Sequence, residues 1–267
     1  MRRWVPTDED GHRRWQLAVA TVALVVSVVA AGGTWWSATH RGATVVENHN
    51  TIVSQTPPIQ PGSDDTSKLC QPTSSGGSLA SWGPDRPMFP AGQDPPYLAV
   101  NAHNDDPDHG SERNAVGILP LDEAMSERGR GWQDRLEVTR DNIYVVRMRV
   151  HFIGPENATG SGVTAMFNLP TCTGHRIGIF GIISSDDAFP YETWDGVTVW
   201  SRDDFNLVYI PDTAVYVPAD GDPIPLNGEE ELLTAKGALL GSNTPDGIMR
   251  AGESGYVYLK IRPQFAG

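Results

Sequence analysis

Short apolar runs alternate with turn-forming residues over most of the chain beyond residue 96. In the segment 142–152, apolar residues occupy the even positions from Tyr144 to Phe152, whereas Arg147, Arg149 and His151 lie among the odd positions. This period of two is typical of a β-strand that buries one face against a core and exposes the other to solvent. We therefore predict a strand here, with His151 as a partly exposed residue on its polar side.

Similar runs predict a chain built from many short strands. Turn-rich segments such as GPENATGSG and PADGDP separate the runs, and the sequence contains 28 glycines and 21 prolines, which favours turns over long helices. Strands are predicted at 97–103, 115–121, 135–139, 142–152, 162–169, 175–184, 196–201, 205–210, 213–217 and 255–263. Short helices are predicted at 121–129, with Asp122 as N-cap, and at 229–237. This spacing of strands predicts an all-β fold, an antiparallel β-sandwich.

The N-terminal part of the chain carries a different pattern, one long apolar run. Residues 17–36 are uncharged and mostly apolar, and about 20 such residues form a helix that crosses the hydrocarbon core of a membrane. Arginines precede this run and acidic residues follow it, which places residues 1–14 in the cytoplasm. We predict an uncleaved single-pass anchor at 15–37 in the cell membrane. The alternative is a cleaved signal peptide ending at Val29-Ala30-Ala31, and both interpretations place the remainder outside the cytoplasm.

Composition divides the exported part in two. Residues 38–90 are rich in Pro, Gly, Ser and acids and lack apolar periodicity, so we predict a flexible tether there and the β-sandwich domain at 91–267. The chain has two cysteines, Cys70 and Cys172. Because the predicted compartment is oxidising, we expect these two residues to form a disulfide.

Charge narrows the classes of partner. The formal net charge is −13 at pH 7, and a negative surface repels the phosphates of nucleic acids. We therefore expect no nucleic-acid partner, and a surface that suits divalent cations or basic partners. The sequence contains no Gly-x-Ser-x-Gly, His-Glu-x-x-His or Walker motif, so we assign no catalytic residues and favour a non-enzymatic role.

Several motifs occur in an order that resembles a group of actinobacterial exported proteins of unassigned activity. They are NAHNDDPDHGSER, Trp132 before a strand, YVVRMRVH, WDGVTVWS with FNLVYI, and TPDGIMRAGESGYVYLKIRP. The resemblance covers about residues 97–263 and implies a membrane-anchored domain of immunoglobulin-like β-sandwich type. Members of that group tend to have Thr-Asp-Asn-Pro and Gly-Asp-Glu-Arg where this chain has NDDP (104–107) and GSER (110–113). They also tend to follow the strand histidine with Asn-Asn, where this chain has Phe152 and Ile153.

The segment 101–114, NAHNDDPDHGSERN, concentrates oxygen ligands. Asp105, Asp106, Asp108 and Glu112 could supply the carboxylates that Ca²⁺ prefers. Their spacing does not match the ligand positions of an EF-hand loop. One interpretation of this segment is therefore a calcium site with an unfamiliar spacing.

Two other interpretations of this segment remain open. His103 and His109 are six residues apart with acids between them, a spacing that matches no helix-borne zinc motif. The run DDPDHG is also ordinary turn chemistry, because Asp side chains bond nearby amides, Pro fixes φ and Gly adopts positive φ. In that structural interpretation, Glu112 and Arg113 pair with or cap buried groups across the sandwich.

Aromatic residues provide the second candidate site. Trp132, Trp194, Trp200 and Tyr191 could form a platform on which sugars stack, and packing inside the sandwich is the alternative. Taken together, the sequence predicts a cell-surface interaction or structural module with protein or cell-wall partners. The alternatives are a module that binds cell-wall glycan and, from a different class, an envelope hydrolase.

Overall fold

The computed structural model describes residues 69–73, 78–125 and 131–265. These residues form mostly antiparallel β-sheet with two single helical turns, α2 (Leu121–Ala124) and η2 (Gly228–Leu232), so the predicted all-β class is confirmed. The predicted cytoplasmic stub, the anchor at 15–37 and the first part of the tether lie outside the described residues. Within the described ranges, no helix has the length and apolar character needed to cross a membrane.

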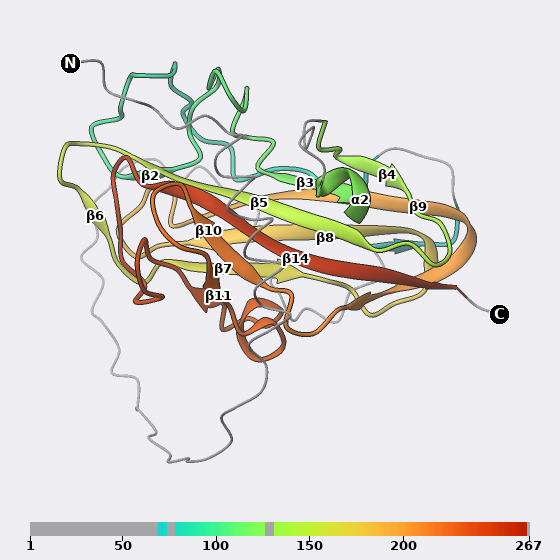
Figure 1. The fold of residues 1–267 in the computed structure, drawn as a ribbon. Helices are drawn as coiled ribbons and strands as arrows, with labels where there is room; N and C mark the ends of the chain where they lie inside the picture. The colour runs from blue at the N-terminus through green and yellow to red at the C-terminus, as the bar shows by residue number, and fades with distance from the viewer. Residues whose placement is uncertain (1–68, 74–77, 126–130, 266–267) are drawn as a thin grey trace, which may run out of the picture.

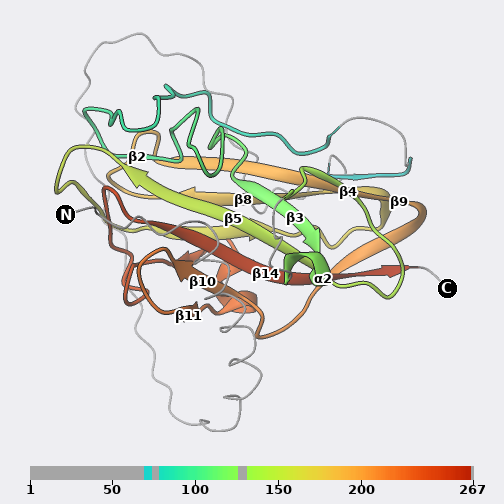
Figure 2. The same ribbon diagram turned by 45° about the horizontal axis from the view of Figure 1, so that its top comes forward.

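The strands follow one another along the chain, with their bounds as follows: β1 (Cys70–Gln71), β2 (Ala99–Val100), β3 (Val116–Pro120), β4 (Arg135–Glu137), β5 (Tyr144–Ile153), β6 (Thr159–Gly160), β7 (Thr164–Asn168), β8 (Gly174–Ser184), β9 (Glu192–Tyr209), β10 (Val215–Pro218), β11 (Ile224–Pro225), β12 (Ala238–Leu239), β13 (Met249–Arg250) and β14 (Ser254–Phe265). The longer strands form two groups. In the first, β5 lies between β3 and β14, and β14 continues to β10 and β11. In the second, β8 lies between β7 and β9. Figures 1 and 2 show β5 and β14 crossing over β8 and β7.

One strand, β9, belongs to both groups. Its first part pairs with β8 from Glu192 to Trp200, and its last part pairs with β14 from Phe205 to Tyr209. The sequence predicted two strands here with a break at 202–204, and this break is wrong. The three polar residues at 202–204 continue the strand and are exposed where it passes from one group to the other, so they are hydrated without a turn.

The main core lies between the two groups of strands. The even positions of β5, from Tyr144 to Phe152, are at most 1% exposed and pack in one cluster with residues of β7, β8 and β9. The alternation predicted that the odd positions face solvent. Val145 and Arg149 do not, because they are only 0% and 7% exposed, whereas Arg147 and His151 are half-buried. Val145 packs with Ala124 of α2, and the segment 101–114 covers Arg149.

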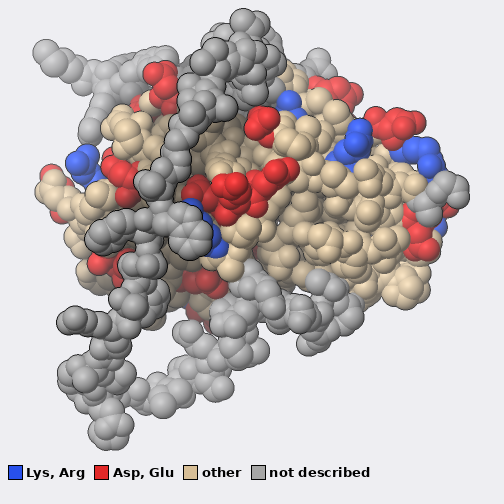
Figure 3. All heavy atoms as spheres, turned by 90° about the horizontal axis from the view of Figure 1, so that it is seen from below, with Lys and Arg blue, Asp and Glu red and all other residues tan. Residues whose placement is uncertain are grey.

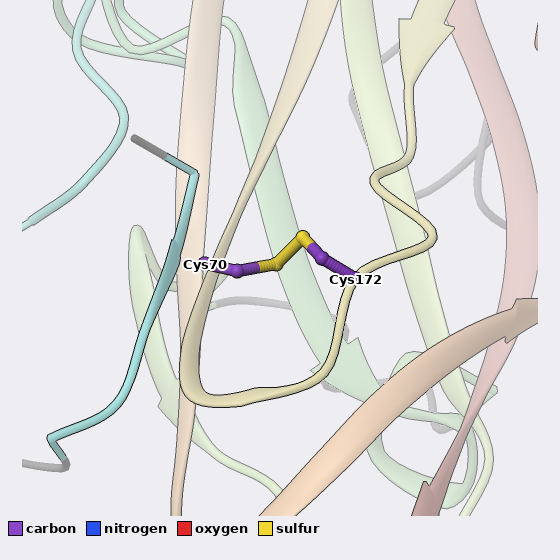
Figure 4. Close-up of a disulfide and its surroundings, with 2 residues drawn as sticks. All are labelled: Cys70 and Cys172. Atoms are coloured by element: carbon purple, nitrogen blue, oxygen red, sulfur yellow. A yellow bond between two sulfur atoms is a disulfide. The ribbon is translucent and has the colours of Figure 1, made fainter. Parts of the chain in front are cut away.

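The predicted disulfide is present. Cys70 and Cys172, 102 residues apart in sequence, are bonded with their Cα atoms 6.2 Å apart (Figure 4). The bond joins the segment that carries β1 to the loop that precedes β8, and β1 pairs with β8. The described end of the predicted tether therefore lies on the β-domain, where Gly83 also exchanges backbone hydrogen bonds with Trp194.

The helical turns differ in detail from the predicted helices. In α2, Pro120 takes the N-cap position without a side-chain hydrogen bond, and Asp122 lies in the first turn. The prediction of Asp122 as N-cap is therefore wrong. In η2, the Asn227 side chain accepts a hydrogen bond from the Glu230 N–H at 3.2 Å, which caps the turn within the predicted segment 229–237.

Candidate functional site

The segment 101–114 folds over the outer face of β5 and places its polar side chains against those of the strand. The residues that meet there are His103, Asp106 and Glu112 from the segment, and Arg149 and His151 from β5. We call these five residues the His–Glu cluster. Figure 2 shows this part of the chain lying over one end of β5, near β2.

Asn101 fixes where the segment meets the strand. Its side-chain amide donates to the Arg149 carbonyl at 2.8 Å and its Oδ1 accepts from the His151 N–H at 2.9 Å. It has a φ of 49° and is 1% exposed, and asparagine is among the few residues that tolerate this left-handed conformation. The Asn101 side chain thus satisfies backbone groups of β5 that a neighbouring strand would otherwise bond.

The turn at 106–110 has the side-chain bonds expected of its sequence. Asp106 Oδ1 accepts from the N–H groups of Asp108 and His109 at 2.9 and 3.0 Å. Gly110, with a φ of 71°, donates its N–H to the Asp106 carbonyl at 2.7 Å. This leaves Asp106 Oδ2 directed towards Arg149, at 3.3 Å from a guanidinium nitrogen.

Glu112 is the centre of the cluster. Its side chain is 0% exposed, and Oε1 lies 2.6 Å from His151 Nδ1 and 2.9 Å from Arg149 Nε. Its Oε2 accepts from the His103 N–H at 2.9 Å. Burial opposes ionisation of Glu112, but the hydrogen bond and charge of His151, the charge of Arg149 and the His103 N–H outweigh it and lower the pKa to about 2. Glu112 is therefore a buried carboxylate at any physiological pH.

Arg149 is a buried cation held by several partners. Burial disfavours its charge, but Tyr256, Glu112 and Asp106 outweigh that effect and raise the pKa of Arg149 further above its usual value. The Tyr256 hydroxyl lies 3.5 Å from Arg149 and 2.6 Å from His109 Nδ1. The polar network thus extends from the loop across β5 to β14.

The cluster also groups potential metal ligands. One ring nitrogen each of His103 and His151 and one oxygen each of Asp106 and Glu112 lie within 4.8 Å of one another. The two imidazole rings have centroids 5.3 Å apart. Among the described residues, His103 Nε2 is a buried atom without a hydrogen-bond partner.

The structure divides the predicted calcium ligands. Asp106 and Glu112 join the cluster, whereas Asp105 Oδ1 accepts from the Ala91 N–H at 2.6 Å. Asp108 lines a neighbouring groove of about 380 Å³. Of the two histidines considered for zinc, His103 joins the cluster and His109 bonds Tyr256. His151, which joins the cluster from β5, was predicted only as a partly exposed strand residue, because its partner comes from a distant segment.

The four predicted aromatic residues have different local surroundings. Trp194 and Trp200 share a face of β9 but are six residues apart, about 20 Å along a strand. Arg147 lies 4.3 Å over the ring of Trp132, which lines the groove beside His109. Tyr191 is 70% exposed. Within the described ranges, no ring contact joins any two of the four.

A second buried carboxyl lies on the other side of the segment. Asp195 in β9 is 6% exposed and accepts from the Val116 N–H at 2.8 Å. Burial outweighs these hydrogen bonds and raises the pKa of Asp195 to about 7. Nearby Arg86 is also 6% exposed and donates to the Asn101 carbonyl at 2.9 Å, and burial lowers its pKa to about 10.

Comparison with protein-family models, curated proteins and solved structures finds no match to this chain. The function must therefore be inferred from the geometry. A carboxylate that bonds an imidazole fixes the tautomer and orientation of the ring, an arrangement found in general bases, metal sites and buried ion pairs. In this cluster Glu112 is fully enclosed and the His151 side chain is only 14% exposed, which favours a role in holding the loop over reaction with a large substrate.

Proposed function

We propose that this protein is a membrane-anchored, extracytoplasmic domain of immunoglobulin-like β-sandwich type that acts by contact with another protein at the cell surface. The disulfide between Cys70 and Cys172 supports an oxidising compartment. The apolar run at 17–36 followed by acidic sequence supports the anchor and its orientation. The two groups of antiparallel strands with a shared core support the sandwich.

The observation that carries the proposed contact is the position of the exposed apolar side chains. The large hydrophobic residues that the described chain leaves exposed are Phe189, Tyr191, Leu239 and Ile248, at 53%, 70%, 43% and 45%. We call these four residues the apolar end. They belong to two segments: 185–191, which follows β8, and 239–248, which begins with the last residue of β12.

Hydrogen bonds through a third segment tie these two segments together. Ser161 accepts from the Asp186 N–H at 2.9 Å and donates its hydroxyl to Asp187 at 2.6 Å. Two residues later, Val163 exchanges backbone hydrogen bonds with Gly247 and Leu240. Exposed aromatic and aliphatic side chains on loops that are fixed by hydrogen bonds are characteristic of protein contact sites.

Charge indicates the kind of partner. Asp186, Asp187 and Asp246 are exposed beside the apolar residues, and Figure 3 shows more acidic than basic side chains on the face seen there. An apolar centre with an acidic rim fits a partner that offers apolar residues surrounded by Lys or Arg. A glycan is less well supported, because the tryptophans are separated and Arg147 lies over the ring of Trp132.

Photo-crosslinking in intact cells tests this proposal. A photoreactive amino acid is placed at Tyr191, at Ile248 or, as the matched control, at the exposed Asp203 in the middle of β9. We expect a crosslinked protein of one size from Tyr191 and Ile248 and none from Asp203. Equal crosslinking from all three positions refutes the proposed contact. Absence of crosslinking from every position also refutes it, provided that an extracellular protease removes the C-terminal domain and so shows that the domain is accessible at the cell surface.

A further inference from the structure

The His–Glu cluster contains more ligand groups than its hydrogen bonds use. His103 is 6% exposed, and its Nε2 has no hydrogen-bond partner among the described residues. A buried nitrogen of this kind is unfavourable unless another group binds it. Its ring contributes a nitrogen to the set of four ligand groups within 4.8 Å of one another. The ring that carries this unused nitrogen therefore lies where two carboxylates and a second imidazole converge.

We propose that a single Zn²⁺ ion binds between the segment 101–114 and β5, with four protein ligands: His103, Asp106, Glu112 and His151. Zn²⁺ accepts both imidazole nitrogens and carboxylate oxygens and prefers four ligands in a tetrahedral arrangement. Sites in which the protein supplies all four ligands are structural, whereas catalytic sites keep a position for water. The ion would hold the loop on the strand, which goes beyond the proposed contact at the apolar end.

Arg149 is compatible with an ion at this position. An ionised carboxylate has about four lone-pair positions, and Glu112 accepts three hydrogen bonds, from Arg149, His151 and His103. The ion replaces the proton that His151 shares with Glu112, and Arg149 continues to donate to both carboxylates. Carboxylates that bind metals are commonly hydrogen-bonded in this way. Two carboxylates against one guanidinium also leave a net negative charge when both histidines are neutral.

The ligand types select zinc over calcium. Ca²⁺ takes six to eight oxygen ligands, and the cluster offers two carboxylates and two imidazoles. The acids that would complete an oxygen shell lie elsewhere, since Asp105 bonds Ala91 and Asp108 faces the neighbouring groove. Imidazole suits Zn²⁺ and other late transition metals, and carboxylates alone suit Ca²⁺ and Mg²⁺.

Metal binding to the full-length chain in mild detergent tests the proposal. The chain is stripped with EDTA, dialysed, and titrated with ZnCl₂, CaCl₂ or MgCl₂ in a calorimeter. We expect one Zn²⁺ per chain, a higher melting temperature with Zn²⁺, and no comparable binding of Ca²⁺ or Mg²⁺. His103→Gln and His151→Gln should each weaken Zn²⁺ binding at least tenfold. The matched control is His175→Gln, at a half-buried histidine outside the cluster, and it should bind as the wild type does.

Absence of Zn²⁺ binding by the wild type overturns the proposal, and so does binding that both cluster variants retain. If the variants do not fold, X-ray absorption of the zinc-loaded wild type decides. Scattering from two imidazoles and two oxygen ligands supports the site, whereas a shell of oxygens alone, or one that includes sulfur, overturns it. The apolar end can fail its crosslinking test without affecting this result.

Discussion

The exchange of Glu112 for glutamine keeps the size of the side chain but removes its negative charge from beneath the segment 101–114. Glu112 is fully buried and accepts from His151, Arg149 and the His103 N–H. After the exchange, Arg149, whose side chain is 9% exposed, keeps Asp106 at 3.3 Å as its ion-pair partner within the cluster. We expect Glu112→Gln to destabilise the domain, because the buried Arg149 cation loses an anionic partner and cannot contact water in its place.

The size of the effect follows from two independent arguments. A carboxyl pKa lowered from 4.5 to about 2 corresponds to about 3 kcal/mol of extra stability from the ionised form at neutral pH. Removal of one partner from a buried ion pair typically costs about 3–5 kcal/mol. We therefore expect Glu112→Gln to lower the free energy of unfolding by about 3 kcal/mol at pH 7.

The pH dependence makes this prediction sharper. Because the folded pKa lies below the unfolded value, the contribution of Glu112 is fully present above about pH 5 and is lost as the pH falls towards 2. Urea unfolding of wild type and variant, followed by tryptophan fluorescence with EDTA present, should give midpoints that differ at pH 7, differ by about half as much at pH 3, and converge near pH 2. A variant that unfolds at the wild-type urea concentration at pH 7 refutes the reasoning. The control is Glu231→Gln, which removes an ion pair with Lys236, 67% exposed, and should cost less than about 1 kcal/mol.

Three further exchanges test other parts of the structure. Asp195 has a folded pKa of about 7 against an ordinary value of 3.8, so wild-type stability should rise as the pH falls from about 7 to 4. Asp195→Asn should lack this rise in a series of melting temperatures, and equal slopes for the two chains would contradict the assignment. Replacing Cys70 and Cys172 with serine opens a loop of 102 residues and should lower the urea midpoint by the equivalent of about 4–5 kcal/mol; an unchanged midpoint would show that the bond adds no stability. Gly83→Ala places a Cβ 2.3 Å from a ring atom of Trp194 and should cost about 1–3 kcal/mol, with a shifted tryptophan emission spectrum; wild-type values of both would rule out this close packing.

The face of β5 that points to the core could be predicted from alternation, because every even position from Tyr144 to Phe152 is apolar and packs inward. The surroundings of the odd positions could not be predicted from alternation. Periodicity shows that Arg149 and His151 are polar, and solvent is then the simplest expectation. Their actual cover is a segment about forty residues earlier in the chain, and no local pattern encodes which segment folds over a strand.

The His–Glu cluster shows even more clearly that a local sequence pattern does not reveal contacts between distant segments. The sequence identified Asp106 and Glu112 as members of a segment dense in acids, but it grouped them with Asp105 and Asp108 because closeness along the chain was the available guide. The turn at Gly110 directs Asp106 and Glu112 towards β5, while Asp105 bonds Ala91. The disulfide was predictable because the chain has two cysteines, which leave one pairing. The continuity of β9 was not predictable, because exposed polar residues such as those at 202–204 are equally compatible with a turn and with a solvated part of a strand.

The last strand of the chain has a consequence for how the protein is made. β14 pairs with β5, β9 and β10, so it sits in the middle of the sheet although it follows all three of these strands along the chain. Until residues 254–265 have been synthesised, its neighbours have unpaired hydrogen-bonding edges, and such edges favour misassembly. The domain can therefore close only after residues 254–265 have been synthesised, and a chain truncated before Ser254 should be degraded.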